Sequence, residues 1–156
     1  MSVAFRRDSD EEHLEPKFEI PIPRGPNLVT ERGLAMIRAR VVDLDALLLT
    51  LEGEDAIKAA KRDRRYWTTR AATAELAPVP TGDTVEFGCT AVIAFKGKTR
   101  RIAIVGDDEA DPAHDRLSFS APLSRAVMGA EVGERLPFAG QDDAIEVLEI
   151  IVEQPR

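Results

Sequence analysis

Residues 34–51 read LAMIRARVVDLDALLLTL, and their apolar side chains recur at the spacing of one helix face. Intervals of three and four residues alternate between Leu34, Ile37, Val41, Leu44, Leu48 and Leu51. This spacing places all of them on a single stripe of an α-helix. The segment therefore predicts a helix that begins after Thr30, whose hydroxyl is suited to an N-cap, and that ends before Gly53.

A second stripe follows Gly53 and predicts a second helix. Its members alternate at the same intervals and are Ile57, Ala60, Arg64, Trp67, Ala71 and Ala74. Two stripes joined by a short turn predict an antiparallel helical hairpin, a coiled-coil arm over residues 28–76. Arg64 is charged, so either its side chain extends past the partner helix or the register shifts there.

Residues 77–156 predict a small antiparallel α+β domain. Short β-branched or aromatic runs occur at Val85–Phe87, Cys89–Phe95, Arg101–Val105, Leu117–Ser120, Arg135–Phe138 and Ala144–Val152. A short helix fits Pro122–Met128, with Ser120 as its N-cap and Gly129 after its end. The predicted fold class is therefore α+β, a helical hairpin followed by an antiparallel sheet with one short helix. Residues 1–27 carry many charges and four prolines, and we expect them to form a flexible tail.

The composition excludes several classes of function. One cysteine in 156 residues excludes an internal disulfide and a zinc site made of several cysteines. A net charge of −7 argues against duplex DNA or an anionic membrane as an autonomous target. No apolar run is long enough to span a bilayer, and the acidic start does not have the pattern of a signal peptide, so we expect a cytoplasmic protein.

Two charged groups on the predicted hairpin are candidate sites. The turn carries Glu52, Glu54 and Asp55, which are either metal-directing carboxylates or a solvated turn favoured by the helix dipole. The second helix carries a basic flank of Lys58, Lys61, Arg62 and Arg65, with Arg64 and Arg70 adding to its charge. This flank either binds an anionic partner or is ordinary solvated helix charge.

The densest acidic cluster lies outside the hairpin. Asp107, Asp108, Glu109 and Asp111 could suggest a calcium loop, but the glycine and distal glutamate of an EF-hand are absent, which favours a turn at a strand end. His13 and His114 have no nucleophile in reach by sequence, and Cys89 has the pattern of a small buried residue. No catalytic triad or phosphate-binding glycine loop is visible.

Three segments give the chain a resemblance to a known family. They are NLVTERG at 27–33, RIAIVGDDEAD at 101–111 and LSFSAPLSRAVMG at 117–129, followed by Glu131-Val132-Gly133 and a last strand with EVLEI at 146–150. In these segments the chain resembles the bacterial GreA/GreB transcript-cleavage factors over about residues 28–153. The resemblance is specific in the second domain and weaker in the arm.

The resemblance implies that an FKBP-like second domain docks at the rim of the RNA polymerase secondary channel while the arm enters the channel. The docking residues are then Ser120, Ala121, Pro122 and Arg125, of which Ser120 and Ala121 depart from the family's S-P motif. Tip carboxylates would help to hold Mg²⁺ in the active centre of the polymerase, which is itself the enzyme. The basic flank would face RNA or the acidic channel wall, and we expect a monomer without a cofactor of its own.

The arm departs from the family in length and at its tip. It is shorter than the usual arm by roughly twenty residues, which at about 1.5 Å per residue in each helix removes about 15 Å of reach. The tip motif G-D-x-x-E-N is absent, and Gly53, Glu54 and Asp55 are partial substitutes. The sequence therefore predicts weak or no stimulation of cleavage, and it is also similar to the regulator of nucleoside diphosphate kinase, a short-armed relative.

Two functions of other classes stay open. A peptidyl-prolyl isomerase would share the implied fold, but its pocket is lined by aromatic residues, and the second domain offers only Phe87, Phe95, Phe119 and Phe138. An acidic domain with a helical arm could also be an interaction module unrelated to transcription.

Overall fold

The computed structural model describes residues 19–153, which fall into two compact units. The arm unit comprises residues 19–25 and 37–73, and the C-terminal unit comprises residues 26–36 and 74–153. Helix α2 (Glu31–Thr50) therefore begins in the C-terminal unit and continues into the arm unit. The sequence places residues 28–36 in the arm, because a helical pattern does not indicate what the first turn of the helix contacts.

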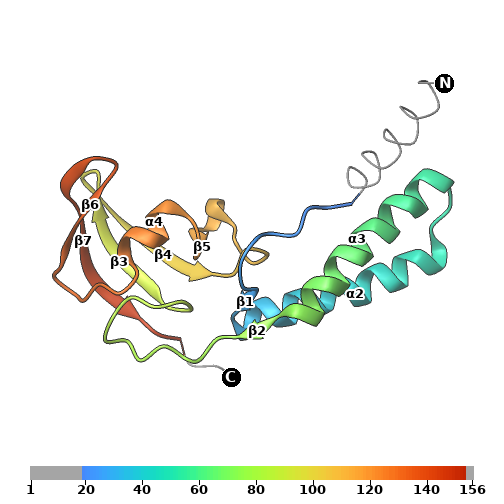
Figure 1. The fold of residues 1–156 in the computed structure, drawn as a ribbon, viewed down its shortest axis with the longest axis horizontal. Coiled ribbons are helices and arrows are strands. Elements are labelled where there is room, and N and C mark those ends of the chain that lie inside the picture. Colours follow the sequence, from blue (N-terminus) through green and yellow to red (C-terminus); the bar gives the residue numbers. More distant parts are fainter. Residues whose placement is uncertain (1–18, 154–156) are drawn as a thin grey trace, which may run out of the picture. The chain divides into compact units, whose positions relative to one another are not determined.

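The arm unit is built on a pair of helices, α2 and α3 (Glu54–Thr73), joined by a turn at Gly53 (Figure 1). Gly53 has a φ of +97°, a left-handed conformation that glycine adopts without steric cost. Every residue of the two predicted stripes is buried or half-buried. Val42 and Leu49 lie off the stripe and are 66% and 86% exposed.

Two contacts across the pair fix its antiparallel register. The Arg64 guanidinium of α3 donates to the Asp45 carboxylate of α2. The Arg40 guanidinium of α2 lies 5.5 Å from the centroid of the Trp67 ring. Residue numbers rise along α2 from Arg40 to Asp45 while those of their partners on α3 fall from Trp67 to Arg64, so the two helices are antiparallel. The predicted hairpin is confirmed, and Arg64 keeps its place on the stripe because it reaches Asp45 at the helix surface.

The C-terminal unit contains a five-stranded sheet in the order β5-β4-β3-β7-β6 (Figure 1). Its strands are β3 (Thr90–Phe95), β4 (Lys98–Val105), β5 (Arg116–Ser118), β6 (Arg135–Phe138) and β7 (Gln141–Ile151). A 3₁₀ turn, η1 (Pro112–His114), precedes β5, and helix α4 (Pro122–Val127) lies between β5 and β6 in the chain. The predicted α+β class is confirmed.

The core of this unit lies between the sheet and α4. Alternate strand residues such as Ile93, Ile104 and Val147 are fully buried, as a strand with one covered face requires. From α4, Leu123 and Val127 join the same cluster. The burial of these side chains holds the short helix in place, since six residues are too few for a helix to be stable alone.

Two strand predictions differ from the structure. Strands β4 and β5 are parallel, so the sheet is mixed, because η1 and its flanking loop return the chain before β5 begins. Residues 85–87 do not form a strand. Val85 and Phe87 are buried, but Cys89 N donates to Glu86 O at 3.1 Å and closes a turn there. The alternating apolar residues of this segment therefore give the same sequence pattern as a strand, although the segment forms a turn.

A two-stranded parallel ladder joins β1 (Leu28–Val29) to β2 (Glu75–Leu76). The sequence pattern contains no signal for it, because two residues are too few to show a period. Gly106, directly after β4, packs against β1. A Cβ at Gly106 would lie 2.3 Å from the Leu28 carbonyl oxygen, so only glycine fits this position.

We predict that Leu44→Asp destabilises the arm unit by roughly 1–3 kcal/mol, because it places a charge on the covered stripe. Asp45→Ala, one residue further, removes only the exposed ion pair with Arg64 and should cost less than about 1 kcal/mol. Urea unfolding followed by helical circular dichroism measures both. Equal losses of stability would contradict the register.

Candidate functional site

The predicted docking residues lie in the loop between β5 and α4, which carries Ser120 and Ala121, and in α4 itself, which carries Pro122 and Arg125. An aspartate from the segment after β4 holds this loop. The Ser118 hydroxyl donates to Asp107 Oδ1 at 2.6 Å, and the hydroxyls of Ser118 and Ser120 lie 2.8 Å apart. The Ser120 hydroxyl also lies 3.4 Å from the same Asp107 oxygen. Asp107 thus fixes the position of both serines.

Ser120 is not the N-cap of α4, contrary to the sequence prediction. Ala121 occupies that position in an extended conformation and has no polar side chain with which to cap the helix, while the Ser120 hydroxyl bonds to Ser118 and Asp107 instead. Pro122 is the first residue of α4, as predicted. Ser120, Pro122 and Arg125 are exposed, while Ala121 is half-buried. The loop and the start of α4 therefore present a small surface of polar, apolar and cationic groups.

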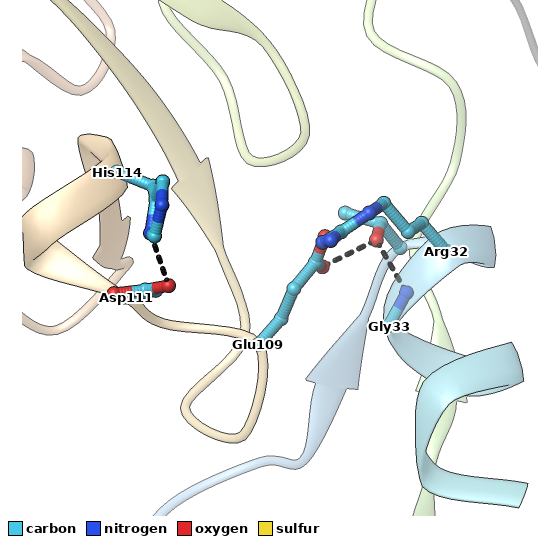
Figure 2. A network of polar contacts seen from close by, with 6 residues as sticks. Arg32, Gly33, Glu109, Asp111 and His114 are labelled. Atoms are coloured by element: carbon cyan, nitrogen blue, oxygen red, sulfur yellow. Dashed lines mark hydrogen bonds and ion pairs between the residues drawn. The ribbon is translucent and has the colours of Figure 1, made fainter. Parts of the chain in front are cut away.

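A second polar network lies at the first turn of α2, within the C-terminal unit (Figure 2). The Glu109 side chain is only 5% exposed. Its carboxylate accepts from the Thr30 hydroxyl at 2.6 Å and from Arg32 Nη1 at 2.8 Å. The Thr30 hydroxyl accepts the Gly33 N–H at 3.0 Å, which confirms Thr30 as the N-cap. Gly33 leaves room for the carboxylate, since a Cβ there would lie 2.8 Å from Glu109 Oε1.

The acidic cluster after β4 does not converge on one point. Asp107 bonds the docking loop, Glu109 bonds the first turn of α2, and Asp111 lies 2.6 Å from His114 Nδ1 (Figure 2). Within residues 19–153, no three His, Cys, Asp or Glu side chains gather closely enough to hold a metal ion. The strand-end turn is the arrangement observed.

The predicted tip carboxylates lie at the turn between α2 and α3. Glu52, Glu54 and Asp55 are all exposed, and Glu54 and Asp55 belong to the first turn of α3. Glu54 forms an exposed ion pair with Lys58 at 3.5 Å. Carboxylates in the first helical turn are favoured by the helix dipole. The tip is thus a solvated acidic turn that holds no metal site by itself.

The basic flank lies along one face of α3, because Lys58, Lys61, Arg62 and Arg65 follow a spacing of three, one and three residues. Arg62 lies 3.8 Å from the neighbouring Asp63 carboxylate. Arg65 donates to Glu19, which precedes the arm in the chain. Lys61 forms no ion pair within the described part of the chain. The flank is therefore only partly neutralised.

The aromatic residues of the C-terminal unit do not line a common pocket. Phe87 and Phe119 form one edge-to-face pair with centroids 5.6 Å apart, and Phe95 and Phe138 form another at 5.4 Å. Burial raises the pKa of the Cys89 thiol, so its reactive thiolate is disfavoured. No helix among residues 19–153 combines the length and hydropathy needed to cross a bilayer.

Residues 80–152 match the family described as "Transcription elongation factor, GreA/GreB, C-term". Over these residues the chain is similar to the C-terminal domain of the GreA/GreB factors. The Transcription elongation factor GreA of Caulobacter sp. (strain K31) is 47% identical over 55 residues, 34% of this chain and 35% of that protein. That of Rhizobium etli (strain CIAT 652) is 33% identical over 87 residues, 53% of this chain and 54% of that protein. The chain thus spans about a third to a half of the length of these relatives.

Solved structures of similar proteins cover more of the chain at lower identity. The GreA factor homolog 1 of Thermus thermophilus is 16% identical, with a TM-score of 0.36 over 81% of this chain and 99% of that one. The GreA/GreB elongation factor from Nitrosomonas europaea is also 16% identical, with a TM-score of 0.38 over 82% and 99% of the two chains.

Sequence reasoning missed the two residues that organise these sites. The sequence assigns Asp107 and Glu109 to a turn at a strand end without partners, yet each binds a segment distant in the chain. The only signal is their place in RIAIVGDDEAD, one of the segments that carry the family resemblance. Spacing within that segment cannot identify partners 11 or 79 residues away.

We predict that Glu109→Ala destabilises the C-terminal unit by about 1–3 kcal/mol, because the Thr30 and Arg32 donors lose their common acceptor. Hydrogen exchange should increase at the Gly33 amide, whose bond partner Thr30 is no longer held. The matched control Asp111→Ala removes the exposed contact with His114 and should leave this amide unchanged. Faster exchange in the control alone would contradict the assignment.

Proposed function

We propose that the protein is a transcription elongation factor that binds RNA polymerase through its C-terminal unit. The observation that carries this proposal is the family match over residues 80–152, which contains the exposed residues Ser120 in the loop before α4 and Pro122 and Arg125 in α4. Asp107 orients this loop before any partner binds, which lowers the entropic cost of binding. The protein contributes a docking surface and an arm, while the polymerase in the cytoplasm performs the chemistry.

We propose that the protein is a monomer and a short-armed member of the family. Its arm would enter the secondary channel of the polymerase. Helices α2 and α3 have 20 residues each, which corresponds to about 30 Å of length at the α-helical rise. The basic flank would then face RNA in the channel, since phosphates attract exposed lysines and arginines. As part of this proposal, the short arm makes the protein similar to the regulator of nucleoside diphosphate kinase.

The fit of the tip to Mg²⁺ is partial. Glu52, Glu54 and Asp55 offer the oxygen ligands that Mg²⁺ prefers, but they form no three-ligand set with other described residues. Any ion near the tip would need most of its ligands from the polymerase. Mg²⁺ in such a position would stabilise the negative charge that develops during phosphodiester cleavage. We propose that the protein stimulates cleavage weakly and acts mainly by occupying the channel.

We predict that Ser120→Arg and Pro122→Ala each weaken binding to core RNA polymerase by about 1–3 kcal/mol, as expected for central contacts. Surface-immobilised polymerase and the full-length variants measure this by equilibrium titration. Gln141→Arg adds the same charge at an exposed position in β7 and serves as the control. If all three variants bind as the natural protein does, the docking surface lies elsewhere.

We also predict little release of 3′ RNA when the protein is mixed with a backtracked elongation complex. A long-armed cleavage factor should release the fragment rapidly and should be slowed by competition with this protein. Glu54→Ala/Asp55→Ala should leave both results unchanged. Fast release by the natural protein that disappears in the double variant would contradict occupancy and assign the tip carboxylates a metal-directing role.

A further inference from the structure

The segment that precedes the arm contacts the basic flank of α3. Residues 19–25, EIPIPRG, belong to the arm unit, and we call them the strap. Arg65 Nε donates to both carboxylate oxygens of Glu19 at 2.9 and 3.1 Å, and Arg65 Nη2 lies 2.6 Å from Glu19 Oε1. This fork geometry is the strongest arrangement that an arginine and a carboxylate can form.

The contact with Glu19 engages Arg65 of the flank but leaves its side chain accessible to solvent. Arg65 and Glu19 side chains are 54% and 49% exposed, so a competing anion can reach the guanidinium from solvent. The hydrogen bond from Arg65 lowers the pKa of the Glu19 carboxyl. Pro21 and Pro23 prevent the strap from becoming helical, so Glu19 reaches α3 from an extended segment.

We propose that the strap is an autoinhibitory contact: Glu19 occupies Arg65 on the basic flank of α3 and competes there with the phosphate backbone of single-stranded RNA. A tethered carboxylate acts at a high effective concentration, so RNA must displace it before it gains Arg65. The proposal deepens the proposed function, on which it rests for the presence of RNA near the arm.

The test uses the full chain and a fluorescein-labelled 12-nucleotide oligouridine as the probe, with anisotropy measured from about 25 to 200 mM KCl. Glu19→Gln should bind this RNA about two- to five-fold more tightly than the natural protein, the range expected for release of an exposed ion pair. Its salt dependence should steepen by about 0.7 in the slope of log affinity against log salt, because one more phosphate is neutralised.

Two further variants complete a double-mutant cycle. Arg65→Gln should weaken RNA binding, and in its presence Glu19→Gln should have no further effect, because the residue that Glu19 occupies is gone. Glu149→Gln removes the same charge from an exposed position in β7 and is the matched control. Circular dichroism checks that every variant is folded.

Several results would overturn the proposal. These are an unchanged affinity in Glu19→Gln, an equal gain in Glu149→Gln, or undetectable RNA binding by Glu19→Gln at the lowest salt. A gain in polymerase affinity without a gain in RNA affinity would show that the flank serves a protein surface, which also overturns it. Because the RNA titration contains no polymerase, a failure of the docking-loop variants leaves this result intact, and the two failures can be told apart.

Discussion

A buried carboxylate is stable only where donors and an opposite charge replace the water that it has lost. Glu109 meets this condition through the first turn of α2, where Arg32 supplies the charge and Thr30 supplies a hydroxyl. The same hydroxyl caps the helix by accepting the Gly33 N–H. The carboxylate therefore makes the start of an arm helix part of the C-terminal unit. Gly33 and Gly106 are the two positions at which the absence of a side chain permits this close packing.

The segment after β4 organises two surfaces that are distant in sequence. Asp107 holds the loop before α4, and Glu109, two residues later, holds the first turn of α2. Asp107 and Glu109 can contact different segments because the chain turns here, with Glu109 N and Ala110 N both donating to Gly106 O. The acidic residues of this segment thus act as structural anchors, which explains why their density does not produce a metal site.

The parts of the fold that the sequence predicted are those with a repeating pattern. The stripes of α2 and α3 have enough repeats to fix the helices, their turn and their facing residues. Strand β6 was predicted with its observed bounds, whereas β1 and β2 are too short to show any period. Residues 85–87 have the two-residue period of a strand, but the chain forms a turn there. The networks of Asp107 and Glu109 depend on tertiary placement, which a pattern along the chain does not contain.

Length and charge constrain the arm in different ways. The α-helical rise sets the extent of a 20-residue helix at about 30 Å, and no change of side-chain charge alters that extent. A carboxylate acts on Mg²⁺ only when its oxygen lies within about 2–2.1 Å of the ion, so a shortened arm loses this role abruptly. Attraction between the basic flank and phosphate declines gradually, over a Debye length of about 8 Å at physiological salt. Under the proposed function, a short arm would therefore keep an electrostatic role in the polymerase channel after losing a ligand role, and the Glu19 carboxylate would set how much of the charge of Arg65 is available.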